Sequence, residues 1–282
     1  MLHISPGFTL YCAFLAALIG LCAGSFLCCA GQRAAHKASV LKGRSHCDSC
    51  GHVLSARDLI PLVSFVLAGG RCRYCGKRLS PLMPAAELLT AGVFLLLLFR
   101  FDISLRLWEG LLLSSILLAC TFADLEGYII PDRFILLGVL VRLLFIFLSR
   151  DLPAQLLAAV LGGFCVAAAV LLAALAMEKL LKREAMGGGD IKLLFLTGLY
   201  LGWQKNLLCL LLACLFGLIF GAVALHLKRR GSGPVPPADG EAEEEMADEK
   251  LFPWGPSIAL AAIAAYTYGD SIISWYLGLF GM

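Results

Sequence analysis

The stretch that decides the fold is AQLLAAVLGGFCVAAAVLLAALAM, at residues 154–177, and it contains no charged side chain. About 20 consecutive apolar residues are enough to cross the hydrocarbon core of a bilayer as a helix. In lipid the backbone has to satisfy its own hydrogen bonds, which a helix does within a single segment. This stretch therefore predicts a transmembrane helix.

Similar apolar blocks recur along the chain. Of the 282 residues 60% are hydrophobic and 15% are charged, whereas a soluble domain is about half apolar and a quarter charged. The Leu, Ala and Phe runs lack the alternation of a membrane barrel. We predict an all-α polytopic membrane protein, embedded in lipid, with about eight transmembrane helices. The expected spans are 8–30, 85–100, 107–123, 134–149, 154–177, 190–203, 206–227 and 255–280.

The positions of Lys and Arg predict the orientation of these spans. With the N-terminus outside, 18 of the 23 basic residues fall in the inside segments 31–84, 124–133, 178–192 and 228–254. Cytoplasmic loops are enriched in Lys and Arg, so both termini are expected outside. The formal net charge of +3 is too small to suggest a nucleic acid partner.

Two segments outside the spans are polar enough to be soluble. Residues 31–84 are expected to form a small cytosolic domain, and residues 228–252, rich in Gly, Pro and Glu, a disordered cytosolic loop. The predicted organisation is a first transmembrane helix at 1–30, the cytosolic domain at 31–84 and a transmembrane core at 85–282.

Four cysteines in the cytosolic domain predict a metal site. Cys47 and Cys50 form one C-x-x-C pair and Cys72 and Cys75 another; each pair precedes a glycine, and 21 residues lie between them. Such a glycine permits a tight turn with positive φ, and four thiolates surround a structural zinc ion as a tetrahedron. We expect a zinc knuckle, since a small domain with a thin core often needs a metal to fold.

Two alternatives to a four-cysteine zinc site are open. Disulfides are disfavoured because the cytosol is reducing. His46 and His52 flank the first pair and either is able to replace a cysteine, although four thiols suffice. Zinc is favoured over iron because no redox role is visible, and four protein ligands leave no position open for water.

Two aspartates at the expected cytosolic boundary of the membrane predict acid–base catalysis by a pair of carboxyl groups. Asp124 ends the third span and Asp190 begins the sixth. Ionisable groups at membrane depth are costly and mark functional sites. Two carboxylates brought together tend to share a proton, so that one acts as a base and the other as an acid. There are two structural alternatives. Asp190 is able to act as a helix N-cap, and either aspartate is able to be a charged helix end that faces water.

The residues around Asp190 favour the catalytic interpretation. The glycines before it allow a substrate strand to approach closely, and the supporting loop is assigned to Gly187, Gly188, Gly189 and Lys192. Glu87 stands at the start of the second span. We expect it either to support the structure or to take part in substrate binding or methyl transfer. Glu126 is expected to be solvated, and Asp132 to cap the fourth helix.

The chain resembles the type IV prepilin peptidases, also called prepilin leader peptidase/N-methyltransferases. Motifs in order over most of the chain carry the resemblance. They are GSF at 24–26, the two knuckles around DLIPLVSF, RCRYCGKRLSPLMPAAELLTA at 71–91, ADLEGYIIPDR at 123–133, GGGDIKLL at 187–194 and FPWGPSIAL at 252–260.

This resemblance implies a multipass aspartyl peptidase of the bacterial inner membrane with Asp124 and Asp190 as catalytic residues. It implies that the short basic leader of prepilins or pseudopilins is removed on the cytosolic face. It also implies methylation of the new N-terminus with S-adenosylmethionine. A peptidase without methyltransferase activity, an ion- or proton-coupled transporter using the paired aspartates, and a scaffold docking through the knuckles are the alternatives.

Overall fold

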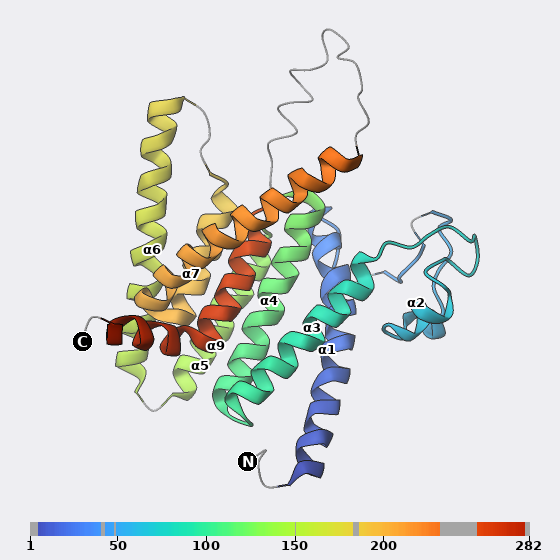
Figure 1. Cartoon of the computed structure of the whole chain (residues 1–282), viewed down its shortest axis with the longest axis horizontal. Helices are drawn as coiled ribbons and strands as arrows, with labels where there is room; N and C mark the ends of the chain where they lie inside the picture. The colour runs from blue at the N-terminus through green and yellow to red at the C-terminus, as the bar shows by residue number, and fades with distance from the viewer. Residues whose placement is uncertain are drawn as a thin grey trace. The chain divides into compact units, whose positions relative to one another are not determined.

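The predicted all-α class is confirmed by the computed structural model. β pairing in the described chain is limited to two isolated bridges, His46 with Val53 and Arg71 with Arg78. The chain divides into two compact units, Met1–Glu126 and Gly127–Met282 (Figure 1). The structure describes residues 5–40, 43–47, 49–149, 151–182, 186–231 and 253–279, with only the backbone of 227–231.

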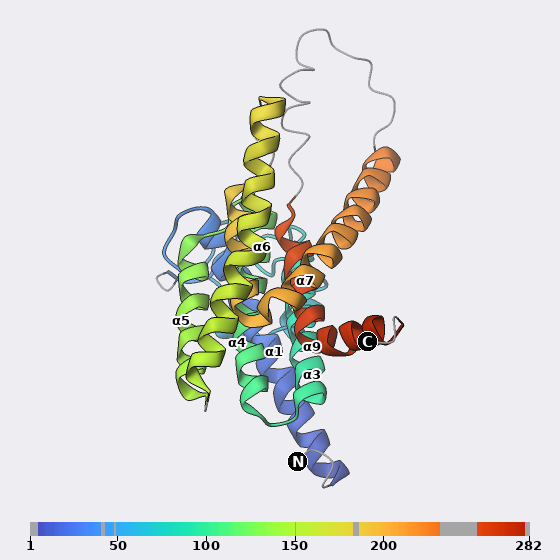
Figure 2. The same cartoon turned by 90° about the vertical axis from the view of Figure 1, so that its left-hand side faces the viewer.

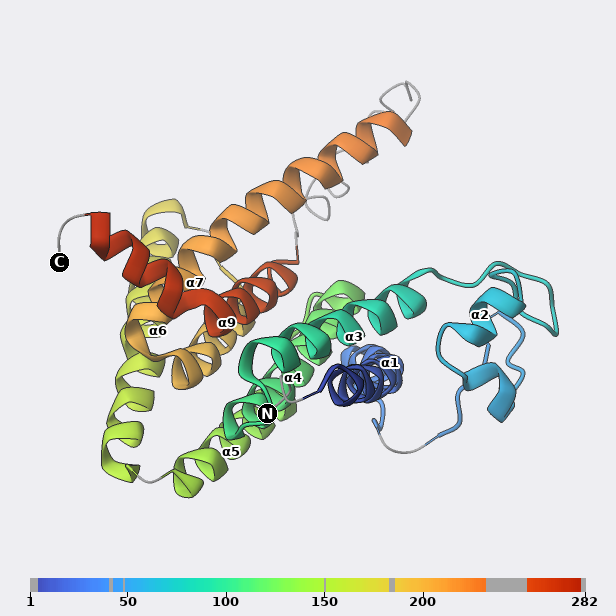
Figure 3. The same cartoon turned by 60° about the horizontal axis from the view of Figure 1, so that its bottom comes forward.

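The first unit is built on the packing of α1 (Pro6–Ala35) against α3 (Leu82–Phe101), which Figure 3 shows with α1 nearly end-on. The hydroxyl of Ser5 accepts a hydrogen bond from the amide of Phe8 at 3.2 Å and so caps α1. Gly24 brings the two helices together, because a Cβ there would lie 2.7 Å from the Ala86 carbonyl oxygen. The short elements η2 (Ala56–Leu59) and α2 (Val63–Leu67) precede α3, and α4 (Leu105–Gly127) follows it.

The second unit contains α5 (Asp132–Leu148), α6 (Leu152–Leu181), α7 (Gly188–Gly231) and α9 (Gly255–Leu279). The helix α7 packs against both α6 and α9, and Figure 2 shows α6 beside α5 and α7. Residues 228–231 continue α7, so they do not belong to the loop predicted at 228–252; the remainder of that loop, 232–252, lies outside the described residues.

Five helices in the described chain are long and apolar enough to cross a membrane: α1, α3, α4, α6 and residues 188–226 of α7. The predicted number of eight spans is not confirmed. α5 has 17 residues, and α9 is interrupted by polar residues such as Thr267 and Asp270. Large apolar side chains nevertheless point outward throughout, for example Phe147 at 80% and Leu172 at 67% exposure. Such a surface is typical of contact with lipid.

A break inside α7 lies near the end of the predicted span 190–203, shortly before the predicted span 206–227. Gly202 has φ 73° and ψ 171°, which is not helical and which a residue without Cβ adopts most readily. Backbone groups freed by a break at membrane depth need partners from neighbouring elements. Arg142 of α5 supplies one, because its Nε donates to the carbonyl oxygen of Leu199 at 2.8 Å.

Asn206 supplies further hydrogen bonds beside this break. Its side chain is fully buried, and its Nδ2 donates to the carbonyl oxygens of Leu194 at 3.1 Å and of Gly162 at 3.3 Å. Its Oδ1 accepts from the hydroxyl of Thr197 at 2.9 Å. Since Gly162 belongs to α6, the same amide also ties α6 to α7.

Close contact between Gly162 and Gly198 allows this arrangement, since small residues let membrane helices approach. A Cβ on Gly198 would overlap the carbonyl oxygen of Gly162 and would lie 2.5 Å from Nδ2 of Asn206.

We expect Gly198→Ala to lower the melting temperature of the detergent-solubilised protein by several degrees, because overpacking costs about 1–3 kcal/mol. The matched control is Gly221→Ala in the same helix element, where a Cβ meets no atom within 4 Å. Equal melting temperatures for the two variants would contradict a stabilising role for the close contact between Gly162 of α6 and Gly198 of α7.

Candidate functional site

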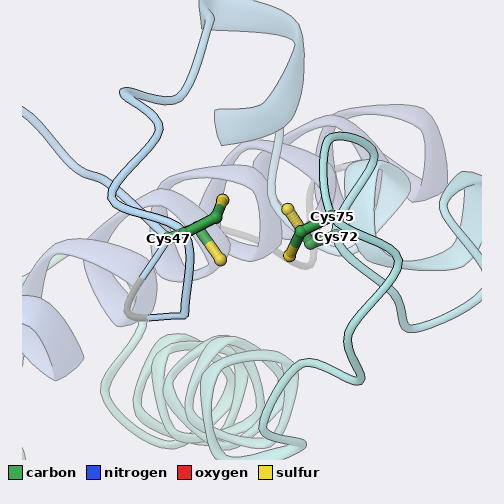
Figure 4. Close-up of side chains that lie close together, drawn as sticks. Cys47, Cys72 and Cys75 are labelled. Carbon is green, nitrogen blue, oxygen red and sulfur yellow. The ribbon is translucent and has the colours of Figure 1, made fainter.

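The four predicted cysteines form one cluster. The sulfur atoms of Cys47, Cys50, Cys72 and Cys75 all lie within 4.8 Å of one another, and Figure 4 shows the sulfurs of Cys72 and Cys75 facing Cys47 from the opposite loop. No pair is joined as a disulfide. Neither flanking histidine belongs to the cluster, so the cysteines by themselves are able to hold a metal ion.

Each C-x-x-C pair lies in a loop of the same design. In the first loop the amide of Gly51 donates to the carbonyl oxygen of Cys47 at 2.8 Å, and in the second the amide of Gly76 donates to that of Cys72 at 2.9 Å. The two glycines have φ of +70° and +71°, which confirms the prediction that each knuckle needs a residue without Cβ at this point.

Backbone amides in the first loop favour the thiolate form of a ligand. Those of Ser49 and Cys50 lower the pKa of Cys47 to about 6. A thiolate, and not a thiol, is the form that binds a metal. The loop therefore favours the thiolate form at Cys47, whereas loss of hydration and the neighbouring Cys47 and Cys75 raise the pKa of Cys50 to about 11.

Asp58 links the two knuckles. Its Oδ2 accepts hydrogen bonds from the Ser55 hydroxyl at 2.6 Å and from the Tyr74 hydroxyl at 3.0 Å, and its Oδ1 lies 3.5 Å from Nη1 of Arg73. Ser55 follows the first loop, whereas Arg73 and Tyr74 lie inside the second. The side chain is 10% exposed, so one carboxylate serves partners from both halves of the domain.

Asp124 lies in the last turn of α4 and is 5% exposed. This end of α4 is held against α1, because a Cβ on Gly31 would lie 2.7 Å from Cβ of Phe122. Glu126 is exposed, as expected, and it also accepts a hydrogen bond from Nε2 of Gln32 at 3.2 Å and lies 3.3 Å from Nε2 of His36. The sequence contains no local signal for these pairs, since they join residues about ninety positions apart.

Asp190 lies in the first turn of α7 and is partly exposed. Its amide donates to the carbonyl oxygen of Gly187 at 3.1 Å. A Cβ on Gly189 would lie 3.1 Å from Cβ of Ile130, so the glycine lets this turn pack closely on the segment before α5. Lys192 donates to Asp132 at 2.6 Å, so this lysine joins the start of α7 to the start of α5.

Glu87 is 4% exposed and holds the knuckle segment on α3. Its Oε2 accepts a hydrogen bond from the amide of Leu62 at 2.7 Å, and Leu62 precedes α2 with φ of +57°. Beside it lies a cavity of about 540 Å³, formed by α1, the knuckle segment, the start of α3 and Glu126, all within the first unit.

Comparison with known proteins places this chain in a family. Residues 18–101 match the bacterial peptidase A24 N-terminal domain, and residues 111–222 match the type IV leader peptidase family. The chain belongs to the type IV leader peptidase family. This confirms the resemblance inferred from the motifs.

Several proteins named prepilin leader peptidase/N-methyltransferase are similar to this leader peptidase. That of Bacillus subtilis (strain 168) is 34% identical, over 92% of this chain and 96% of its own length. That of Myxococcus xanthus is 34% identical, over 95% and 94%, and that of Aeromonas salmonicida (strain A449) is 35% identical, over 83% and 74%. No solved structure is significantly similar to the chain.

The sequence did not reveal Asp58 or the cavity of this leader peptidase. Asp58 gives no signal by itself, because its partners are assembled only when both loops have folded. The catalytic roles of Asp124 and Asp190 stay predictions, with Asp124 in the first unit and Asp190 in the second.

We expect Asp58→Asn to loosen the knuckle domain at neutral pH. The Ser55 hydroxyl, with Tyr74 and Arg73, lowers the pKa of Asp58, so the folded domain binds the carboxylate more tightly than the acid. This stabilisation is present above the unfolded pKa of about 3.9 and is lost as the pH falls through the lower folded value.

Hydrogen exchange read by mass spectrometry should show faster exchange of residues 55–75 in Asp58→Asn. The control is Asp270→Asn, which removes an exposed carboxylate paired with Lys205. Unchanged protection of residues 55–75 at pH 7 would contradict a linking role for Asp58.

Proposed function

We propose that this protein is a membrane aspartyl endopeptidase that removes the short basic leader of type IV prepilins or pseudopilins and methylates the new N-terminus. The observation that carries the proposal is that the chain matches the leader peptidase family over both of its parts and nearly the whole length of relatives named for both activities. S-adenosylmethionine is the methyl donor in this proposal.

Asp124 and Asp190 carry the hydrolysis. With one proton shared between them, the ionised carboxylate takes a proton from a water molecule, which attacks the carbonyl carbon of the scissile peptide. The protonated carboxyl polarises the carbonyl oxygen and later supplies the proton with which the amine leaves. Burial of Asp124 at a helix end favours such sharing, because a low-dielectric environment disfavours two charges.

The glycines before Asp190 support a role in placing this group. Gly189 packs on Ile130, and Lys192 pairs with Asp132. Ile130 and Asp132 follow Asp124 by six and eight residues in the chain. The start of α7 is therefore attached, within the second unit, to the segment that enters α5.

The four cysteines hold zinc in a structural role. Four thiolates at this spacing match the tetrahedral coordination that zinc adopts in such sites, and the domain they organise has two very short helices and few buried side chains. A zinc ion with four protein ligands has no position for water, so it stabilises the knuckle domain and takes no part in hydrolysis.

The chain spans the bacterial inner membrane several times. We propose that both termini face outward and that the knuckles and the aspartates face the cytosol, as the distribution of Lys and Arg favours. In this orientation the basic leader of a substrate reaches the site from the cytosol, while its apolar segment remains in the membrane.

We expect Asp124→Asn and Asp190→Asn each to reduce leader cleavage by at least about a thousandfold, because neither acid nor base catalysis then operates. A synthetic prepilin peptide, incubated with purified protein in detergent and read by mass spectrometry, measures this. The control Asp270→Asn should cleave normally. Normal cleavage by either single variant of the proposed pair would exclude the aspartyl mechanism.

Freshly purified, reduced protein should contain one zinc ion per chain, measured by elemental analysis. Cys72→Ser should lose it, because a hydroxyl is a poor replacement for a thiolate ligand. Cys22→Ser, which changes an exposed cysteine of α1, should retain it. A wild-type protein without zinc, or a Cys72→Ser protein with a full complement, would contradict the assignment.

A further inference from the structure

The segment between the two knuckles is uncharged and lies at the protein surface. Residues 59–70 read LIPLVSFVLAGG, and the nearest charged residues on either side are Asp58 and Arg71. Five large apolar side chains of this segment are 47–73% exposed: Leu59, Ile60, Val63, Val66 and Leu67. Large apolar side chains gathered at a surface mark an interaction site. The metal site and the hydrolysis of the proposed function leave this surface without a role.

Three of the exposed side chains share one face of α2. Val63, Val66 and Leu67 stand at positions i, i+3 and i+4, a spacing that puts side chains on the same side of a helix. Ser64 and Phe65 lie on the other side and line the cavity of the first unit. The helix therefore has an inner face that the first unit covers and an outer face, Val63, Val66 and Leu67, that the described residues leave largely open.

Glu87 fixes the depth of α2 relative to a membrane helix. α3 has 20 residues, which at a rise of 1.5 Å per residue gives about 30 Å, the thickness of the hydrocarbon core. Glu87 follows the first residue of α3, Leu82, by five positions, or about 8 Å along the axis. Because the carboxylate of Glu87 accepts from the amide of Leu62 at 2.7 Å, the start of α2 is held beside the first two turns of α3 (Figures 1 and 3).

The outward-facing apolar surface of α3 begins at the same level. Leu88 and Leu89 come directly after Glu87 and are both exposed, and a spanning helix presents such side chains to lipid. At the boundary between headgroups and acyl chains, an interfacial segment buries an apolar face about 5–10 Å deep. The depth of α2 and the composition of its outer face both match this arrangement.

Basic side chains border the apolar segment. Arg57 precedes it and Arg71 follows it, and both are exposed. The isolated bridge between Arg71 and Arg78 sets these two residues directly opposite each other, and like charges at opposed positions destabilise such a pair. An anionic group close to both arginines would offset this repulsion. The phosphates of anionic lipids supply such groups at a membrane surface.

We propose that the outer face of α2 is inserted into the leaflet at which α3 begins, and that Arg57, Arg71 and Arg78 contact phosphates of anionic lipids there. The knuckle domain is then held at the membrane by lipid as well as by its connections to α1 and α3. A bilayer is favoured over a protein partner because α2 is fixed at the level where α3 itself meets lipid. The inference does not depend on the chemistry of the proposed function.

The test places a photoreactive, diazirine-bearing analogue of leucine at position 67 of the full-length, zinc-loaded protein. The protein is held in nanodiscs of phosphatidylethanolamine and phosphatidylglycerol. Ultraviolet light joins the diazirine to whatever touches it, and mass spectrometry of the labelled peptide identifies the adduct. We expect lipid adducts in a yield similar to that from the same analogue at Leu172 of α6, which is comparably exposed.

The matched control is the same analogue at Phe65, on the inner face of this short helix. It should react with protein groups around the cavity and give several-fold fewer lipid adducts than position 67. Zinc content and melting temperature of each labelled protein should equal those of the wild type, which separates contact with lipid from loss of folding.

A second experiment tests the charges. Replacing phosphatidylglycerol by phosphatidylcholine, or introducing Arg57→Gln together with Arg78→Gln, should lower the yield of lipid adducts at position 67 by at least about twofold. The yield at Leu172 should stay the same, because the surface of α6 at that point does not depend on these arginines.

Adducts at position 67 formed with a second copy of the chain, or with water alone, would overturn the proposal. Equal yields of lipid adducts from positions 65 and 67 would overturn it as well, because the outer face would then have no preference for the bilayer. A yield at position 67 that ignores both the lipid charge and the arginine substitutions would overturn the role given to anionic lipids.

Discussion

Backbone polar groups at membrane depth need partners within the protein, and this constraint governs the second unit. An unbroken helix satisfies it without help, but α7 is interrupted at Gly202. The interruption persists because Arg142 and Asn206 bring side-chain donors to carbonyl oxygens around it. Each of these donors is buried, and each has to come from a defined position on a neighbouring turn or helix.

Close helix contact is the counterpart of this hydrogen bonding. Asn206 reaches α6 only because Gly162 and Gly198 let the two helices meet without intervening side chains. In lipid there is little hydrophobic force between helices, so packing and interhelical hydrogen bonds hold them together. The same argument applies to Gly24 in the first unit, where α1 approaches α3 next to Glu87. Glycines at these helix contacts thus bring polar side chains such as Asn206 within hydrogen-bond distance of the neighbouring helix.

The knuckle domain meets a different requirement, because few of its apolar side chains are buried. Its order comes from the cysteine cluster, from Asp58 between the two loops, and from the bond between Glu87 and Leu62. These contacts also build the wall of the cavity in the first unit. The zinc site of our proposal would therefore stabilise the wall of this cavity.

The sequence by itself determined the helical membrane class, the cysteine cluster and the positive φ of Gly51 and Gly76, because these follow from local composition and spacing. It also indicated the division of α7 to within a few residues, since the predicted gap after residue 203 comes directly after Gly202. Only the tertiary structure decided that Glu126 bonds to α1, that Asp58 joins the knuckles and that Glu87 receives the Leu62 amide beside a cavity. These contacts join residues far apart in the chain or depend on unusual backbone such as that of Leu62, so no local pattern encodes them.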